Sequence, residues 1–171
     1  MPSDYVRLSN LSFHRRSRLY NHRRHQSGII IGAGGGGKYC VLMAVRILIV
    51  DDSAIFREGL REMLEAQIDW QVCGEAVDGL EAVQKNRLLT PHLIIMDLSM
   101  PRMSGLEAAR EILNEFPKVP ILLLTLYLTR QLTDDARHIG IRAIMSKTAM
   151  HHLVESIPGM LRGEVFGAHA S

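Results

Sequence analysis

Five polar side chains follow, or end, the short apolar runs of this sequence. They are Asp51, Asp52, Asp97, Thr125 and Lys147. If the runs are parallel strands of one sheet, their carboxyl ends meet at one edge, which is where ligands bind in such folds. Each residue has an ordinary structural explanation: a helix cap for Asp51 or Asp52, a turn former for Asp97 and a solvated charge for Lys147. Three carboxylates, a hydroxyl and an ammonium on one edge nevertheless predict a functional site.

The three carboxylates indicate the chemistry of that site. Two carboxylates about 4 Å apart repel by roughly 4 kcal/mol at an effective dielectric constant near 20, so three held together require a cation. Oxygen ligands of this kind suit Mg²⁺, which keeps positions for water and phosphate oxygens. A metal, an ammonium and a hydroxyl can neutralise and orient a phosphoryl group in transfer, and a carboxylate can be the nucleophile that becomes an aspartyl phosphate.

The elements that must position these residues alternate between strands and helices. Short apolar runs predict strands, and apolar residues at helical spacing predict a helix after each of them. The predicted strands are Val45–Val50, Gln71–Val77, His92–Met96, Val119–Leu124 and Ile141–Met145, with helices around residues 56–64, 80–88, 106–112, 132–139 and 153–157. Five such units imply an α/β fold in which helices cover both faces of a parallel sheet.

Charge divides the chain into two parts. The net charge is +2, from 20 basic and 18 acidic residues, but residues 1–44 carry +6 and the remaining residues carry −4. We expect residues 1–42 to be a basic, glycine-rich, disordered extension, residues 45–163 to be the folded domain and residues 164–171 to be a short tail. A basic arm for nucleic acid or acidic lipid is the functional alternative for the extension, but its aromatic residues are not patterned for stacking.

A glycine run in the extension matches two phosphate-binding motifs. The segment Gly32–Lys38 satisfies both G-x-G-x-x-G and G-x-x-x-x-G-K. Both motifs need a preceding strand and a following helix, but Tyr39 stands where the second motif has Ser or Thr, and residues 40–45 are strand-like. We interpret the run as low-complexity sequence. Because Met43 begins a segment that reads like the start of a protein, we also hypothesise that residues 1–42 come from a start codon assigned too early.

The cysteines and the apolar runs exclude other classes of protein. Cys40 and Cys73 are far apart and belong to no C-x-x-C or Cys/His cluster, which argues against a disulfide framework, a zinc site or a thiol redox motif. Such cysteine usage agrees with a reducing cytoplasm. No apolar run reaches the roughly 18–20 residues that span a bilayer. We therefore expect a cytoplasmic protein that has no membrane partner.

Residues 45 to about 163 resemble the receiver domain of a two-component response regulator, a CheY-like domain. The motifs that carry the resemblance are Ile47–Ser53 (ILIVDDS) and Asp97–Gly105 (DLSMPRMSG), with Thr125 and Ser146-Lys147-Thr148. The resemblance implies a flavodoxin-like, doubly wound five-stranded parallel sheet, (βα)5, with strand order 2-1-3-4-5. It also implies that the protein is a phosphoprotein of a phosphorelay, whose phosphoryl donor is a sensor histidine kinase.

The resemblance assigns the metal ligands and the acceptor. Asp97 would accept the phosphoryl group and, with Asp52 and the backbone carbonyl of Ser99, would bind Mg²⁺. Asp51 would act mainly through metal-bound water. Catalysis would be limited to self-phosphorylation from phosphohistidine or small phosphodonors and to autodephosphorylation.

The resemblance also assigns a switch. Lys147 would pair with the phosphoryl oxygens, and Thr125 would turn its hydroxyl toward them, which changes the loop after the fourth strand. Ile144 stands where the family usually has Tyr or Phe, so the usual coupling of Thr125 to an aromatic rotamer is in question. Tyr127 is either a partial substitute or a buried packing residue. Pro158 interrupts the last predicted helix, where an interior proline costs about 3 kcal/mol or more.

Finer features resemble the subfamily that continues into a LuxR-type helix-turn-helix. They are Asp52–Leu60, Ala76–Ala82, Lys147-Thr148 and Gly163–Phe166. The few residues after Phe166 cannot form a DNA-binding domain, so we expect no direct DNA binding.

Three functions from different classes remain as hypotheses. The leading one is a stand-alone phosphoacceptor receiver. It either switches a surface for an unknown downstream protein or for homodimerisation on phosphorylation, or it drains phosphate from a kinase. The second is a LuxR-type transcription regulator that has lost its DNA-binding domain by truncation or a frameshift. The third is a nucleotide-binding enzyme built around Gly32–Lys38.

Overall fold

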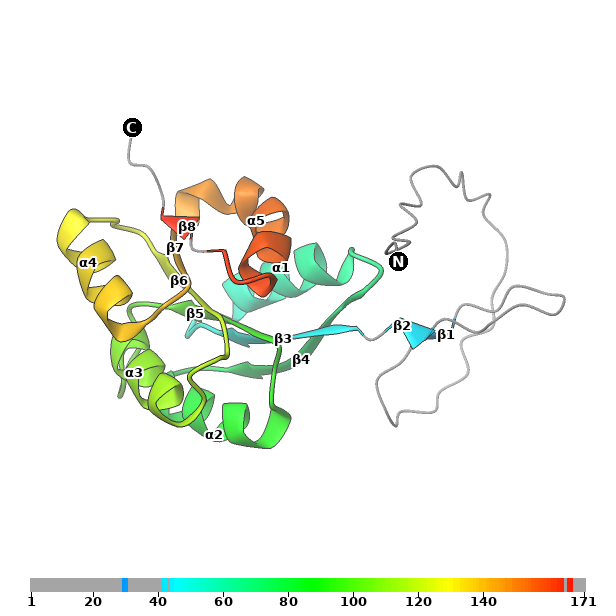
Figure 1. Cartoon of the computed structure of the whole chain (residues 1–171), viewed down its shortest axis with the longest axis horizontal. Coiled ribbons are helices and arrows are strands. Elements are labelled where there is room, and N and C mark those ends of the chain that lie inside the picture. The colour runs from blue at the N-terminus through cyan, green and yellow to red at the C-terminus, as the bar shows by residue number, and fades with distance from the viewer. Residues whose placement is uncertain (1–28, 31–40, 43, 165, 168–171) are drawn as a thin grey trace, which may run out of the picture.

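A computed structural model describes residues 29–30, 41–42, 44–164 and 166–167 (Figure 1). Two strands of two residues, β1 (Ile29–Ile30) and β2 (Val41–Leu42), pair in an antiparallel sense. The rest of the predicted extension, including the glycine run at residues 32–38, lies outside the described residues, as does most of the predicted tail. The predictions of disorder and of an early start codon are therefore not tested by the structure.

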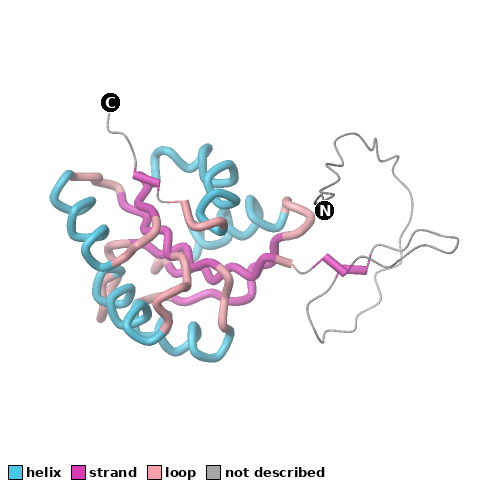
Figure 2. The backbone as a smooth tube through the Cα atoms, in the orientation of Figure 1, coloured by secondary structure: helices cyan, strands magenta, loops and turns pink. Residues whose placement is uncertain are grey.

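A parallel sheet forms the centre of the described domain (Figures 1 and 2). Its strands lie in the spatial order β4-β3-β5-β6-β7, all parallel, which confirms the predicted order 2-1-3-4-5. They are β3 (Val45–Val50), β4 (Trp70–Ala76), β5 (Leu93–Asp97), β6 (Ile121–Thr125) and β7 (Ala143–Ser146). A strand of two residues, β8 (Phe166–Gly167), extends the β7 edge in the parallel sense.

Helices follow the strands in the predicted alternation and cover both faces of the sheet. α1 and α5 lie on one face, and α2 and α3 lie on the other (Figure 1). The helices are α1 (Ala54–Glu65), α2 (Gly79–Leu89), α3 (Gly105–Glu115), α4 (Arg130–Ile139) and α5 (Leu153–Leu161), and a 3₁₀ helix, η1 (Lys147–His152), precedes α5.

The alternation of side chains along β3 explains the two-sided core. Ile47 and Ile49 point into the hydrophobic cluster beneath α1 and α5, whereas Leu48 and Val50 belong to the cluster of α2, α3 and α4. The central strands β5 and β6 are buried along their whole length. Such strands read as continuous apolar runs because both faces of a parallel sheet are covered.

The last helix does not stop at Pro158. α5 continues through this residue to Leu161, so the predicted interruption is wrong. A proline in this position removes one backbone donor, but Leu153, Ile157 and Met160 are fully buried in the cluster shared with α1. Burial of three large side chains, each worth about 1.5–3 kcal/mol, outweighs the local cost.

Candidate functional site

The strand register brings the predicted site residues to one edge of the sheet. Asp97 is paired with Leu124 across β5 and β6, and Thr125 is paired with Ser146 across β6 and β7. Asp51 directly follows β3, and Lys147 directly follows β7. The carboxyl ends of four strands thus supply an acid, a second acid, a hydroxyl and an ammonium to the same place.

The centre of the site is an ammonium held between two buried carboxylates. The Nζ atom of Lys147 lies 2.7 Å from Oδ2 of Asp51 and 2.9 Å from Oδ1 of Asp97. Asp51 is 1% exposed and Asp97 is 5% exposed, and the side chain of Lys147 is 14% exposed. The explanation of Lys147 as a solvated charge is therefore wrong. A cation bridging two desolvated carboxylates offsets their mutual repulsion.

Burial and the surrounding charges shift the proton affinities of these groups. Burial is the main cause that raises the pKa of Asp97 above its ordinary value, and the neighbouring charge of Asp51 adds to it, although Lys147 acts in the opposite direction. Burial alone would lower the pKa of Lys147, but its hydrogen bonds to Asp51 and Asp97 together raise it. The site therefore holds a firmly protonated ammonium beside a carboxylate that is short of stabilising positive charge.

The remaining predicted metal ligands are more exposed. Asp52 and Ser99 both lie at the surface, and the Ser99 amide donates to Oδ2 of Asp97 at 3.2 Å. Within the part of the chain that the structure describes, no three carboxylate, imidazole or thiol groups converge into a ready-made metal centre. Asp51 and Asp97 instead share Lys147.

The donor set fits a hydrated Mg²⁺ rather than a cation enclosed by protein. Mg²⁺ is usually bound by one or two carboxylates and keeps several waters. Asp97, with the exposed Asp52 and the Ser99 carbonyl as further candidate ligands, would offer a set of this kind. Two carboxylates, Asp51 and Asp97, share the single ammonium of Lys147, so the formal charge of this cluster is negative and favours a divalent cation.

The loop that carries Asp51 is fixed by two of its own hydrogen bonds. Oδ1 of Asp51 accepts from the Ser53 amide at 2.9 Å, and its backbone carbonyl accepts from Nη1 of Arg57 at 2.8 Å. The N-cap of α1 is Ser53, whose hydroxyl accepts from the Phe56 amide at 3.3 Å. The explanation of Asp51 or Asp52 as the cap of this helix is therefore wrong, and both carboxylates remain available to the site.

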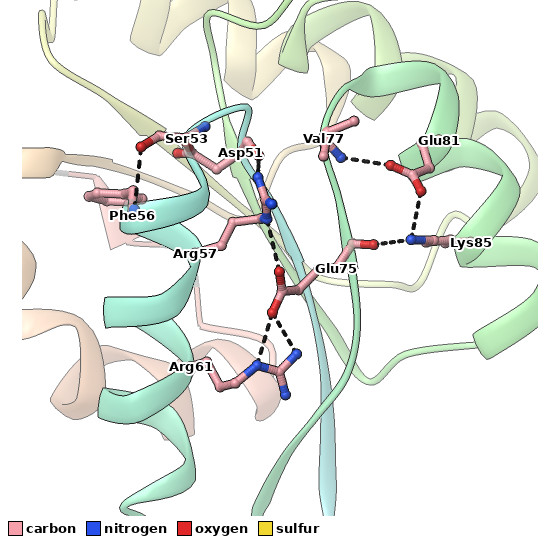
Figure 3. A network of polar contacts seen from close by, with 9 residues as sticks. All are labelled: Asp51, Ser53, Phe56, Arg57, Arg61, Glu75, Val77, Glu81 and Lys85. Atoms are coloured by element: carbon pink, nitrogen blue, oxygen red, sulfur yellow. Dashed lines mark hydrogen bonds and ion pairs between the residues drawn. The ribbon is translucent and has the colours of Figure 1, made fainter.

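A charged network that was not predicted from the sequence is connected to the Asp51 loop through Arg57 (Figure 3). Glu75 on β4 accepts from Nε of Arg57 at 2.8 Å and from Nη2 of Arg61 at 2.6 Å, both on α1. Lys85 on α2 donates to the Glu75 carbonyl and pairs with Glu81. The network ties α1, β4 and α2 together, and Arg57 carries it to the Asp51 carbonyl. Glu81 and Lys85 have the i,i+4 spacing of a helical ion pair, but no spacing in the sequence relates Glu75 to Arg57 or Arg61.

The loop after Asp97 is held by close backbone contacts. The Gly105 amide donates to the Leu98 carbonyl at 2.9 Å, and a Cβ atom at Gly105 would overlap the Asp97 carbonyl oxygen. Arg102, at φ 65°, extends its guanidinium to the carboxylate of Asp78, which is fully buried and caps α2. The overlap explains why the sequence has glycine at position 105. The hydrogen bond of Gly105 and the contact of Arg102 hold the segment that includes Ser99.

The predicted switch residues belong to β6, the loop after it and β7: Thr125 ends β6, Tyr127 lies in the loop, and Ile144 lies within β7. The Thr125 hydroxyl, 3% exposed, donates to the Tyr127 carbonyl at 3.3 Å and accepts from the Tyr127 amide at 3.1 Å. Tyr127 is 82% exposed, so the packing alternative for it is wrong. Ile144 is buried in the cluster of α2, α3 and α4.

An aromatic ring from the start of the helix predicted around residues 56–64 also reaches the site. The ammonium of Lys147 lies over the ring of Phe56, 4.2 Å from its centroid. Phe56 belongs to a helical apolar pattern, and that pattern gives no sign that one of its members contacts a charge.

Comparison with known proteins gives one family. Residues 47–157 match the model of the response regulator receiver domain. The chain is 37% identical over 129 residues to a protein-glutamate methylesterase/protein-glutamine glutaminase 1 of Methanosarcina acetivorans, covering 74% of this chain and 37% of that protein. It is 34% identical over 121 residues to the uncharacterized transcriptional regulatory protein YxjL of Bacillus subtilis, covering 70% of this chain and 56% of that protein.

Solved structures agree with the fold. A two-component response regulator of the LuxR family from an Aurantimonas species superposes with a TM-score of 0.70 at 31% identity, covering 74% of this chain and 91% of that chain. The chain thus covers 37% and 56% of the lengths of these two curated relatives. It covers 91% of the Aurantimonas chain. Among the helices that the structure describes, none is both long and apolar enough to cross a membrane.

Proposed function

Because this chain belongs to the response regulator receiver domain family of two-component signalling, we propose that it accepts a phosphoryl group on Asp97 and thereby switches an interaction surface. The donor is a sensor histidine kinase, and the setting is the cytoplasm. The observation that carries the proposal is the ammonium of Lys147 held between Asp51 and Asp97 at the carboxyl edge of the sheet.

The proposed step transfers a phosphoryl group from nitrogen to oxygen. A carboxylate oxygen of Asp97 attacks phosphorus, the P–N bond of the donor phosphohistidine breaks, and the imidazole leaves with the bonding electron pair and takes up a proton. Bound Mg²⁺, held by Asp97, Asp52 and the Ser99 carbonyl, would neutralise charge on the phosphoryl oxygens. Lys147 is already beside the nucleophile and supplies a second positive charge without reorganisation.

Thr125 and its loop are the proposed reporter of this step. In the described structure the hydroxyl of Thr125 bonds to both backbone groups of Tyr127. A hydroxyl that turns toward a phosphoryl group on Asp97 must give up those two bonds, and the loop with the exposed Leu126 and Tyr127 is then free to rearrange. This rearrangement would alter a surface for a downstream protein or for a second copy of the chain.

A transcription regulator is the second candidate. YxjL is named a transcriptional regulatory protein, and the Aurantimonas structure is of the LuxR family. Helices α1 to α5 all belong to the receiver fold, so any DNA-binding domain would lie outside residues 44–164. Reading the DNA that follows codon 171 distinguishes a receiver from a regulator interrupted by a frameshift.

The test of the proposal is phosphorylation by a small donor. The protein is incubated with Mg²⁺ and acetyl phosphate or phosphoramidate, and intact mass is measured alongside Asp97→Asn. We expect one acid-stable, base-labile phosphoryl group on the parent and none on Asp97→Asn, and Lys147→Ala is expected to label far more slowly. An unlabelled parent, or equal labelling of Asp97→Asn, would contradict the proposal.

A further inference from the structure

The ammonium of Lys147 has three neighbours rather than two. Two are the carboxylates of Asp51 and Asp97, and the third is the face of the Phe56 ring, 4.2 Å from Nζ to the ring centroid. A cation within about 6 Å of a ring centroid is attracted by the ring quadrupole, and the attraction is strongest where water is excluded. With its side chain 14% exposed, Lys147 is close to that condition.

The position of the ring follows from the start of α1. The Phe56 amide is bonded to the Ser53 hydroxyl that caps the helix (Figure 3). The side chain of Phe56 is partly buried against the cluster of α1 and α5. Lys147 begins η1, directly after β7. The first turn of α1 and the connection after β7 therefore meet at Lys147, and the packing of Phe56 against this cluster restricts movement of the ring away from the ammonium.

We propose that Phe56 is a positioning residue that holds the Lys147 ammonium over Asp97. This inference rests on the proposed phosphoacceptor function. A lysine carries its charge on a flexible four-carbon stem, and two ion pairs leave it free to turn outward. The Phe56 ring closes that direction, excludes water from one side of the ammonium and keeps it where a phosphoryl group on Asp97 needs a cation.

The competing explanation is that Phe56 only fills the core beneath α1. Two variants separate the explanations, because Phe56→Leu keeps an apolar side chain but removes the aromatic face, whereas Phe56→Tyr keeps the aromatic face. The matched control is Ile55→Ala, since Ile55 is its neighbour on α1 and is 84% exposed. Melting temperatures of all variants report any general loss of packing.

The first readout is the rate of phosphorylation by acetyl phosphate with Mg²⁺. Phe56→Leu is expected to label about 3- to 30-fold more slowly than the parent, the range that a cation–π contact of this kind gives. Phe56→Tyr should stay within about twofold of the parent, and Ile55→Ala should label at the parent rate.

The second readout needs neither Mg²⁺ nor phosphate. The chain has four lysines, Lys38, Lys85, Lys118 and Lys147, so lysine-selective ¹³C labelling gives few signals. The ε-methylene protons of Lys147 should be shifted upfield by the ring current in the parent and in Phe56→Tyr, and should return to ordinary values in Phe56→Leu.

The two readouts together decide the inference. A Phe56→Leu variant that labels at the parent rate overturns it, as does one that labels slowly while the lysine signals stay unmoved. A parent that does not label at all contradicts the proposed function instead. In that case the NMR signals still report whether the ring covers the ammonium.

Discussion

Asp97 occupies an unfavourable position for a charged carboxylate. It is 5% exposed and lies near a second buried carboxylate, and one ammonium serves both. Burial and the charge of Asp51 raise the pKa of Asp97 despite Lys147. The ionised form of Asp97 is therefore less favourable in the folded protein than in the unfolded chain. Additional positive charge at the site would stabilise it.

Neutralising Asp97 should stabilise the metal-free protein. For an acid whose folded pKa is raised, the cost to folding is absent below the unfolded pKa and is fully present above the folded pKa. At about pH 7, Asp97→Asn is expected to raise the free energy of unfolding by on the order of 1 kcal/mol, or the melting temperature by about 4 °C. This difference in the free energy of unfolding should shrink as the pH falls toward 3.8, the ordinary pKa of an aspartate.

Thermal denaturation without divalent ions, followed by circular dichroism over a pH series, measures this effect. The control is Asp69→Asn, because Asp69 is exposed and far from the site edge. A melting temperature of Asp97→Asn below that of the parent at about pH 7 would show that the pairing with Lys147, rather than burial, dominates the energetics of Asp97.

At the scale of elements, α1 is anchored to β4 by a carboxylate that two arginines share. The side chains of Arg57 and Glu75 are 13% and 29% exposed, so the pair is shielded from solvent in part. Arg57 also holds the Asp51 carbonyl, which connects this anchor to the site (Figure 3). Removing the charge of Glu75 takes a partly shielded partner from both arginines at once, which costs more than the loss of a surface ion pair.

Glu75→Gln is expected to lower the free energy of unfolding by about 1–3 kcal/mol at about pH 7. Glu115→Gln is the matched control, because Glu115 pairs with Arg87 at the surface, and it should cost under about 0.5 kcal/mol. Urea denaturation of the three proteins measures the difference. Equal midpoints for Glu75→Gln and Glu115→Gln would contradict a supporting role for the network.

The pH dependence of the Glu75 effect has the opposite sign to that of Asp97. Burial tends to raise the pKa of Glu75, but the hydrogen bonds from Arg57 and Arg61 outweigh it and lower the pKa below 4.5. Its stabilisation is therefore fully present above that ordinary value and is lost as the pH falls through the lowered pKa. The gap between the parent and Glu75→Gln should stay constant above about pH 5 and narrow in more acidic solution.

The sequence predicts those elements whose signals lie in a short stretch of residues, and it fails where packing between distant elements decides the structure. The strand order was implied by the resemblance to receiver domains. The meeting of Asp51, Asp97, Thr125 and Lys147 at one edge follows from the geometry of a parallel sheet, which the alternation of elements already implies. The path of α5 through Pro158 was not predictable from local preference, because burial against α1 decides it.

Contacts between side chains of distant elements were outside the reach of sequence patterns. Three such contacts depend on rotamers that are set by packing. They are the Phe56 ring over Lys147, the Arg102 guanidinium on Asp78, and the two arginines that share Glu75. Periodicity assigns such residues to a face of an element, but it does not say which charge lies opposite.

At the scale of the whole molecule, the hydrophobic core of the described residues falls within one continuous stretch of the chain. Every residue of the two hydrophobic clusters lies between Val45 and Leu161. The family model matches residues 47–157. We therefore propose residues 45–163 as the receiver, the range given by the resemblance, whose start agrees with the change in charge after residue 44.

A chain that begins at Met43 should behave as the full chain does. Since the clusters and the site edge are retained, the melting temperatures of the two proteins should agree within about 2 °C. Their rates of labelling by acetyl phosphate should also agree. Calorimetry and intact mass measure both quantities, and a shorter chain that melts clearly earlier would show that residues before Met43 stabilise the domain.

The central claim is that Asp97, rather than a neighbouring carboxylate, carries the phosphoryl group. Borohydride reduces an acyl phosphate to an alcohol, so a phosphorylated aspartate becomes homoserine and keeps a permanent mark. After phosphorylation with acetyl phosphate and Mg²⁺, reduction and peptide mass spectrometry, homoserine should appear at position 97 and should be absent when the phosphodonor is omitted. Homoserine at position 51 or 52, or at no position in a labelled protein, would contradict the account.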